Sequence, residues 1–370
     1  MAKDFHNKPF DEETKLKLEI FRKCFREWLP VFLSKKSFDT INIFDFFAGP
    51  GKDCNGIEGS PLIIIDEVKK YLSSPKLPYT DKVSINLFFN DDNHNKIMSL
   101  EKEIASKDKA SLGIKITNNE FLKAFDDCKV LLKSSSEVKL IILDQTGIKH
   151  ITHNTFKELI SFPATDFMFF ISSSTLKRFL SVEEIGQYFP DISVEEIRSI
   201  PATDIHRFVC QYYQKLVPSE TDFYLAPFSI KKQSNIYGII FGSGKLLGLE
   251  KFLKVCWNQD KVSGEANYDI DDDIVRNGIT LYDELNVSKK IGLFEERLIT
   301  FLQDFKSNND LYEFTIKNGC LPRHTYEILC KLQKDRRLEV EPSDTKKRSF
   351  YINWDNYNRR IVKVKVRVSK

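Results

Sequence analysis

The stretch DFFAGPGKDCNGIEGSPLII, residues 45–64, places an acid and two closely spaced glycines directly after an apolar run. Asp45 ends the expected strand, and Gly49 and Gly51 belong to the turn beyond it, where a backbone without Cβ can approach a ligand. No Gly-Lys-Ser/Thr triplet follows, so the stretch is not a P-loop for phosphates. The turn is therefore expected to be a ligand cradle, or else a tight turn capped by a helix start.

The helix after this turn is expected to begin late. It follows Gly59, with Ser60 as its N-cap and Pro61 at its first helical position. An acid before the turn, with no basic residue placed to hold a pyrophosphate, favours a ligand that carries an ammonium group. S-adenosylmethionine is such a ligand, because it has a nucleoside at one end and an amino acid at the other.

Polar side chains also follow the next two expected strands. A carboxylate at the end of the second strand usually holds ribose hydroxyls, and the candidates are Asn90, Asp91 and Asp92. Residues 118–120 follow the third strand, where a polar residue such as Asn119 would meet the adenine amine and a plain polar loop is the alternative. Aspartate in place of Asn90 should tighten cofactor binding if the site is real. The expected cofactor site comprises Asp45, Phe47, Gly49, Gly51, Gly59, Ser60, Asn90, Asp91 and Asn119.

The fourth expected strand ends in Asp144-Gln145-Thr146-Gly147, where amino-directed methyltransferases have Asp/Asn-Pro-Pro-aromatic. The acid can accept a hydrogen bond from a target amine, Gln145 can bond a base edge, and Lys149 can meet a phosphate or carboxylate. Asp144, Gln145 and Lys149 are therefore the candidate catalytic residues. The proline and the aromatic residue are missing, so a strand-end acid that caps the next loop is the alternative for Asp144.

The elements that position these residues alternate between apolar strands and helical patterns. Such strands predict a parallel sheet covered on both faces, and right-handed crossovers would make it a Rossmann-like, doubly wound α/β sheet. Strands are expected at 40–47, 83–91, 112–117, 138–144 and 166–173, and helices at 13–34, 61–72, 94–106, 121–132 and 154–161.

The pattern changes beyond residue 173. Residues 181–205 carry acids and two prolines and are typical of a helical surface insertion, whereas 222–231 and 235–244 predict an antiparallel edge pair before a helix at 246–260. The expected organisation is a helical lead-in at 1–39, a Rossmann-like core at 40–260 with a helical insertion at 181–221, a linker at 261–291 and a last domain at 292–370.

The last domain has three short helical patterns followed by a hairpin expected within 337–352, which is the order of a winged helix-turn-helix. The tail RRIVKVKVRVSK predicts a strand with one apolar and one basic face. A helix for the major groove and interleaved basic and aromatic residues favour nucleic-acid binding, although winged helices also dock proteins and edge lysines also block aggregation. The candidate contacts are Arg323, His324, Lys331, Lys334, Lys346, Lys347 and Arg348.

Composition narrows the classes further. The chain has 370 residues and a net charge of only +3, so nucleic-acid binding has to depend on local charge. The seven cysteines are scattered without ligand spacing, and no metal site is expected. The start is polar, with no signal peptide, and no apolar run is long enough to span a membrane. A cytoplasmic protein without a membrane partner is expected.

Three stretches together resemble the three-Cys-motif partner proteins, a bacterial group that is similar to S-adenosylmethionine methyltransferases. They are FDFFAGPG followed by EGSPLIII, the leading helix TKLKLEIFRKCFREWLPVF, and NGCLPRHTYEILCKLQKDRRLEV near the C-terminus. LIILDQTGIKHI is a weaker match to Asp-Pro-aromatic-Gly followed by Lys. The resemblance implies a class I methyltransferase core, a C-terminal winged helix, a partner protein with a three-cysteine motif, and a mobile-element or phage-defence setting.

The function expected from these observations is that of an S-adenosylmethionine-dependent methyltransferase-like protein that acts on or beside nucleic acid with its partner. The alternative is a non-catalytic adaptor whose core and winged helix bind nucleic acid or protein. A defence effector that modifies or cuts nucleic acid is a weaker third reading, because no carboxylate cluster of nuclease spacing is present.

Overall fold

The computed structural model describes residues 9–34, 38–74, 77–78, 80–107, 112–145, 150–178, 189–273, 288–343 and 349–369. The chain divides into two compact units, Met1–Val255 and Cys256–Lys370, which are described separately. In the described parts of the chain, no helix is long and apolar enough to cross a membrane.

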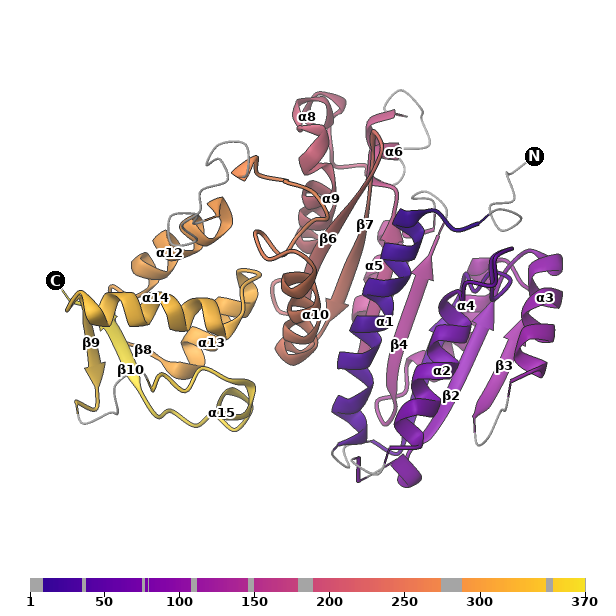
Figure 1. Cartoon of the computed structure of the whole chain (residues 1–370), viewed down its shortest axis with the longest axis horizontal. Coiled ribbons are helices and arrows are strands. Elements are labelled where there is room, and N and C mark those ends of the chain that lie inside the picture. Colours follow the sequence, from indigo (N-terminus) through magenta and orange to yellow (C-terminus); the bar gives the residue numbers. More distant parts are fainter. Residues whose placement is uncertain are drawn as a thin grey trace. The chain divides into compact units, whose positions relative to one another are not determined.

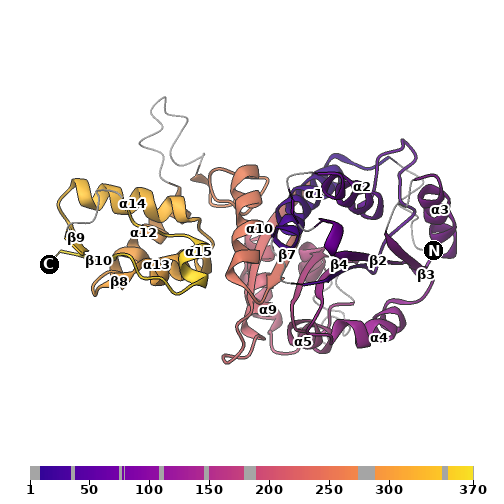
Figure 2. The same ribbon diagram turned by 90° about the horizontal axis from the view of Figure 1, so that it is seen from below.

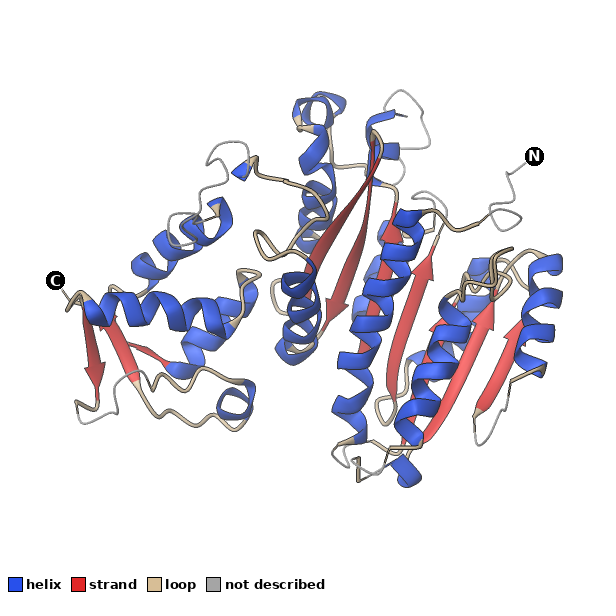
Figure 3. Ribbon diagram, viewed as in Figure 1, coloured by secondary structure: helices blue, strands red, loops and turns tan. Residues whose placement is uncertain are grey.

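The first unit is built on one seven-stranded sheet in the order β3-β2-β1-β4-β5-β7-β6 (Figures 1 and 3). The first five strands of this order are parallel, and β7 runs antiparallel to both of its neighbours. The strands are β1 (Thr40–Asp45), β2 (Ser84–Asn90), β3 (Gly113–Thr117), β4 (Val138–Asp144), β5 (Thr165–Ile171), β6 (Tyr224–Lys232) and β7 (Asn235–Ser243). The predicted mixed α/β fold with a mostly parallel sheet is confirmed, and this order is consistent with a class I methyltransferase-like, Rossmann-like fold.

Helices cover both faces of this sheet. Figure 2 shows α1, α2 and α10 on one face and α4, α5 and α9 on the other. The helices of this part are α1 (Glu12–Leu33), α2 (Ser60–Leu72), α3 (His94–Ala105), α4 (Phe121–Leu132), α5 (His153–Ser161), α6 (Ser173–Arg178), α8 (Val194–Ser199), α9 (Ile205–Lys215) and α10 (Leu246–Gln259), with short 3-10 turns at Thr80–Lys82 and Ala202–Asp204. The boundary between the two units falls within α10.

Helix α1 is part of the core and not a separate lead-in. Asp11 caps it by accepting a hydrogen bond from Thr14 N at 2.9 Å, and it buries apolar side chains at helical spacing, among them Phe21, Phe25 and Leu29. Trp28 Nε1 donates to Asp166 Oδ2 at 2.7 Å, which fixes the helix to β5. This packing brings the charged residues of α1 close to the ends of the strands.

The end of the expected helical insertion at 181–221 forms a helix of the core. Helix α9 packs against β6 and β7 and buries Ile205, Val209 and Tyr213, so it covers one face of the sheet. The acids and prolines that suggested a surface segment lie before it, in and around α8. Residues 181–188 lie outside the described residues.

In its described residues, the second unit has the helices α12 to α15 and a small antiparallel sheet of order β8-β10-β9. The expected hairpin within 337–352 is wrong, because the partner of β9 is β10 in the tail, where Val364 and Val366 are buried. The described linker residues 261–273 contribute buried side chains, among them Ser263, Ala266 and Ile270. The elements are α12 (Lys289–Phe301), β8 (Lys306–Ser307), α13 (Asn308–Lys317), α14 (Pro322–Lys334), β9 (Leu338–Glu341), α15 (Trp354–Asn358) and β10 (Lys365–Val368).

Candidate functional site

The strand order reverses between β1 and β4, and ligands of doubly wound sheets bind outside the carboxyl ends of the strands at such a point. Asp45 ends β1 there and is fully buried. Its carboxylate accepts from Phe47 N at 3.2 Å and from Ser60 Oγ at 2.6 Å. Burial raises the pKa of Asp45 to about 7, the two hydrogen bonds oppose this rise, and the nearby charges of Asp144 and Asp91 add to it.

The expected N-cap at Ser60 is wrong. Gly59 is the N-cap residue of α2, and Ser60 is the first residue of the helix. The hydroxyl of Ser60 is engaged by the buried carboxylate of Asp45 and does not cap the helix. Gly59 instead closes the loop, because its N–H donates to Gly51 O at 2.7 Å and a Cβ at this position would lie 3.3 Å from the same oxygen.

The turn glycines have two different roles. Gly49 and Gly51 have φ values of 66° and 88°, which L side chains rarely adopt. The N–H of Gly49 donates to Asp91 Oδ2 at 3.0 Å, so the turn is tied to the end of β2. A Cβ on Gly51 would lie 3.1 Å from Leu100 Cδ1, so this glycine allows close packing against α3 and is not an opening for a ligand.

Asp91 is the polar residue that best fits a ribose. It is 5% exposed, and its oxygens accept from Gly49 N and from Asn93 N at 3.0 Å each. Lys96 Nζ lies 3.6 Å from Oδ1. A carboxylate can accept about four hydrogen bonds, so Asp91 keeps acceptor capacity for two hydroxyl groups. A cofactor that presents a ribose diol therefore fits this residue.

Asn90 does not fit the predicted cofactor contact. Its Oδ1 accepts from Thr117 Oγ1 at 2.9 Å and from Asn119 N at 3.1 Å. Its Nδ2 donates to Asn119 O at 2.9 Å and to Phe46 O at 3.4 Å. The side chain is 4% exposed and joins the loops after β1 and β3, so we correct its assignment from ligand contact to loop support.

Two other predicted cofactor residues lie around this loop support. Asn119 is half-buried, and its backbone N and O both bond Asn90. Phe47 is half-buried and stacks on Phe121 at a centroid distance of 5.3 Å, with the ring of His150 at 5.2 Å. Phe47, Phe121 and His150 form an aromatic cluster, and aromatic rings of this kind can pack against a nucleobase.

The candidate catalytic acid has a partner that the sequence reasoning missed. Lys17 of α1 places Nζ 2.5 Å from Asp144 Oδ2 and 4.8 Å from the ring centroid of Phe170. The sequence does contain a signal for this partner. Lys17 stands directly before the buried Leu18, on the inner side of the amphipathic helix. Asp144 is therefore an ion-paired acid at the end of β4 and not an isolated carboxylate.

Gln145 follows Asp144 and is 5% exposed. Its Oε1 accepts from His150 N at 2.8 Å, whereas its buried Nε2 has no hydrogen-bond partner within the described residues. A buried amide group without a partner costs free energy, which a ligand acceptor would recover. Lys149, the third candidate catalytic residue, lies outside the described residues.

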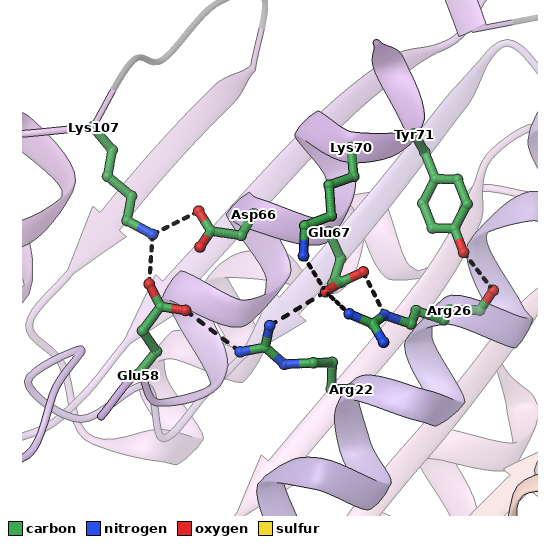
Figure 4. A network of polar contacts seen from close by, with 8 residues as sticks. All are labelled: Arg22, Arg26, Glu58, Asp66, Glu67, Lys70, Tyr71 and Lys107. Atoms are coloured by element: carbon green, nitrogen blue, oxygen red, sulfur yellow. Dashed lines mark hydrogen bonds and ion pairs between the residues drawn. The ribbon is translucent and has the colours of Figure 1, made fainter. Parts of the chain in front are cut away.

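A network of charged side chains joins α1 to α2 and to the loop that carries the turn (Figure 4). Glu67, whose side chain is 2% exposed, accepts from Nε and Nη2 of Arg26 at 2.7 Å each and from Lys70 at 2.9 Å. Burial alone would raise the pKa of Glu67, but these contacts outweigh it and lower the pKa to about 2. Arg22 extends the network from Glu67 at 3.3 Å to Glu58 at 3.4 Å.

The same loop has further supports. Lys107 lies 2.8 Å from Glu58 and 2.6 Å from Asp66, and Phe10 N donates to Asp53 Oδ2 at 2.7 Å. Residues before and within α1 and after α3 therefore hold the loop in place by charge. The loop after β1 is therefore held in place by side chains from several elements and not by its glycines alone.

One buried serine–histidine pair resembles a catalytic dyad but is structural. Ser173 Oγ lies 2.7 Å from His206 Nδ1, and His206 Nε2 lies 3.0 Å from Ile239 O. Both residues are 0% exposed, so a substrate cannot reach them. Gly238 makes room for the ring, because a Cβ there would lie 2.0 Å from His206 Nε2.

The candidate nucleic-acid residues of α14 differ in exposure. Arg323 and Lys334 are exposed, and Lys331 is exposed but paired with Glu295 at 2.8 Å. His324 is 7% exposed, accepts from Leu321 N at 3.1 Å and packs on Trp257 at a centroid distance of 4.2 Å, so its predicted contact is wrong. Burial, with the charges of Arg323 and Lys290, lowers the pKa of His324 to about 4. Lys346, Lys347 and Arg348 lie outside the described residues.

Comparison with known proteins finds solved methyltransferases of low similarity. No family model and no curated protein matches the chain. The CurJ carbon methyltransferase is 14% identical, with a TM-score of 0.29, and the match covers 57% of this chain and about half, 50%, of that one. TomG, an O-methyltransferase of Streptomyces achromogenes solved with S-adenosylmethionine, is 10% identical at a TM-score of 0.32, with 63% and 90% of the chains covered. Magnesium protoporphyrin IX methyltransferase of Synechocystis PCC 6803 is 9% identical at 0.30, with 62% and 84% covered.

At such low identities and TM-scores, these likenesses say nothing of a substrate or a reaction. The site has to be judged from its own contacts. The fold follows from the strand order of this chain itself.

Proposed function

We propose that the first unit binds S-adenosylmethionine at the ends of β1 and β2. The observation that carries this proposal is the contact of Asp91 with the N–H of Gly49 at 3.0 Å. This contact ties the Asp91 carboxylate, directly after β2, to the turn after β1. The carboxylate keeps acceptor capacity for ribose hydroxyls. Asp91 and the Phe47 ring would hold the ribose and the nucleobase, and the buried Asp45 would supply negative charge near the amino-acid end. When bound, the cofactor supplies an electrophilic methyl group.

Charge supports a cationic ligand at this edge. Asp45 is buried with Asp144 and Asp91 close enough to raise its pKa, and Ser60 and Phe47 give it only neutral hydrogen bonds. A ligand with an ammonium group would stabilise the charged carboxylate, since opposite charges favour ionisation. Binding should therefore strengthen as the pH rises through about 7, where Asp45 loses its proton.

A second candidate function is a non-catalytic adaptor. The observation in its favour is the ion pair of Asp144 with Lys17 at 2.5 Å, which engages the acid that would orient an amine acceptor. Methyl transfer needs alignment of the acceptor with the methyl group more than it needs a general base, so the ion pair alone does not decide the matter.

We further propose that the chain is a three-Cys-motif partner protein, which acts on or beside nucleic acid with a partner that carries the three-cysteine motif. The sequence resemblance supports the family, the partner and a phage-defence or mobile-element setting. The order α12, α13, α14 followed by antiparallel strands supports a winged helix in the second unit. Exposed Arg323 and Lys334 support contact with phosphates.

Calorimetric titration with S-adenosylmethionine tests the cofactor proposal. Asp91→Asn replaces one acceptor oxygen by an NH₂ group beside the N–H donors and should weaken binding by about 10- to 100-fold, the value of one or two charge-assisted hydrogen bonds. The matched control is Asp92→Asn, because Asp92 is the exposed neighbour and should leave affinity unchanged.

Two results would contradict the proposal. One is a wild-type protein that does not bind the cofactor from pH 6 to 8, either alone or with nucleic acid. The other is an equal loss of affinity in the Asp91 and Asp92 variants, which would indicate a general effect of surface charge. The first result would favour the adaptor.

A further inference from the structure

The segment Arg359–Lys363, between α15 and β10, is exposed over its whole length. Its sequence is Arg-Arg-Ile-Val-Lys, so two aliphatic side chains lie between cations. Ile361 is 38% exposed and Val362 is 53% exposed. Two neighbouring aliphatic side chains of the segment are therefore accessible for contact.

The backbone of this segment is fixed from below. Asn308 is 0% exposed, donates from Nδ2 to Ile361 O at 3.0 Å and accepts at Oδ1 from Lys363 N at 2.9 Å. Ile361 N also donates to Asn356 O at 2.9 Å. Helix α15 itself packs on α13, where Tyr357 lies 5.1 Å from the ring centroid of Tyr312. The segment is therefore presented in one conformation before any partner arrives, which lowers the entropy cost of binding.

Arg359 and Arg360 differ from the ion-paired cations of this unit. Lys317, Lys331 and Arg367 each have a glutamate within 2.8 Å. Among the described residues, no carboxylate forms an ion pair with Arg359 or Arg360. Lys363 lies over the Tyr351 ring at 5.0 Å, and in residues 349–369 Asp355 is the single acid. An unbalanced positive charge on a fixed surface favours a polyanionic partner.

Arg360 has a left-handed backbone conformation. It follows the C-cap residue of α15 with a φ of 55°, the left-handed position that glycine takes at the lowest cost. An arginine at such a position costs conformational free energy that a glycine would save. Arg336 takes the same left-handed position after the C-cap residue of α14, with a φ of 59°.

We infer that Arg359–Lys363 is the main nucleic-acid contact of the second unit, with the cations on phosphates and Ile361 and Val362 against the sugars of a duplex groove. This deepens the nucleic-acid part of the proposed function and rests on it. Helix α14 is less suited, because His324 is buried, Lys331 is paired and Glu327 is exposed on the same helix. The basic face of β10 is also balanced, since Lys365 and Arg367 lie opposite Glu341 and Glu339.

Fluorescence anisotropy of the full-length chain with a short labelled DNA duplex, over a series of salt concentrations, tests the inference. Removing two phosphate contacts with Arg359→Gln/Arg360→Gln should weaken binding at least about tenfold and reduce the salt slope by about 2. Ile361→Ala/Val362→Ala should weaken binding with an unchanged slope, because it removes apolar contacts and no charge.

Lys317→Gln is the matched control, since it removes an exposed but paired cation of the same unit and should change neither affinity nor slope. Arg323→Gln tests α14 directly. If Arg323→Gln loses binding while the Arg359/Arg360 variant does not, the segment is not the contact and the nucleic-acid proposal stands. If the wild type does not bind the duplex, both are overturned, and a preference for a single strand would overturn the groove assignment. Melting curves of every variant separate loss of binding from loss of folding.

Discussion

At the scale of single residues, the hydrogen bonds of Asn90 and Asp91 give these neighbours different roles, although the sequence alone predicts the same role for both. Asn90 is the last residue of β2, Asp91 follows it, and both are buried. The side-chain oxygen and nitrogen of Asn90 each have two partners, whereas Asp91 has partners for only part of its acceptor capacity. A cofactor can therefore form hydrogen bonds with Asp91, whereas Asn90 already uses its hydrogen-bonding groups to join the loops after β1 and β3.

The first prediction concerns Asn90→Asp. The sequence alone suggests that an aspartate would tighten cofactor binding, but the new oxygen would face the carbonyls of Phe46 and Asn119. We expect a loss of about 1–3 kcal/mol in the free energy of unfolding and no gain in affinity. Urea denaturation and calorimetry measure the two quantities. A variant that is as stable as wild type and binds the cofactor more tightly would show that the loop support is dispensable.

At the scale of elements, α1 holds the site together from outside the expected core. Its inner face packs on the sheet, and its charged residues reach Glu67, Glu58 and Asp144. The network of Figure 4 thus couples the position of one helix to the shape of the loop after β1. Substitutions in α1 should therefore affect binding at the cofactor site.

The second prediction concerns Glu67→Gln. Glu67 is buried and pairs with Arg22, Arg26 and Lys70, so glutamine removes the negative charge and one of the two acceptor oxygens that these cations share. We expect a loss of roughly 2–3 kcal/mol in the free energy of unfolding, less than for a fully buried pair because Arg26 is partly exposed. Chemical denaturation measures it. Lys70→Gln removes an exposed member of the same network and should cost under about 0.5 kcal/mol. Equal losses would argue against a central role for Glu67.

The sequence alone is sufficient to predict helices and strands whose apolar residues repeat with the period of that element. The helix expected at 121–132 and the strand expected at 138–144 match α4 and β4 to the residue, because their apolar positions repeat strongly and their ends are marked by polar residues. Pairing between distant segments is not encoded in this way. The sequence therefore predicts a partner strand for β9 close to it in the chain, whereas the observed partner, β10, lies in the tail. The Lys17–Asp144 pair spans 127 positions and was missed for the same reason.

At the scale of the whole molecule, the two units contain buried groups with opposite responses to pH. In the first unit, burial raises the pKa of Asp45 to about 7 and that of Asp166 to about 6. In the second, burial lowers the pKa of His324 to about 4. A raised carboxyl pKa stabilises the folded state at low pH, and this stabilisation is lost as the pH rises through that pKa. A lowered histidine pKa stabilises at high pH, and that stabilisation is lost as the pH falls from about 6.5 towards 4.

The third prediction follows from these signs. Between pH 7 and pH 5, Asp45 should stabilise the first unit by roughly 2 kcal/mol, while His324 should destabilise the second by a similar amount. Scanning calorimetry should resolve two transitions that move in opposite directions on acidification. Asp45→Asn should reduce the shift of one transition, and His324→Asn should abolish that of the other. Two transitions that move together would contradict the assignment.

The serine–histidine pair of the core has a consequence for how such proteins are surveyed. Any side chain at position 238 would collide with the His206 ring, and the loss of that ring would leave Ser173 and the carbonyl of Ile239 without their partner. Natural variation should therefore be strongly restricted at Ser173, His206 and Gly238. A search for active sites that ranks residues by invariance would select this trio, although invariance there reports tight packing and not chemistry.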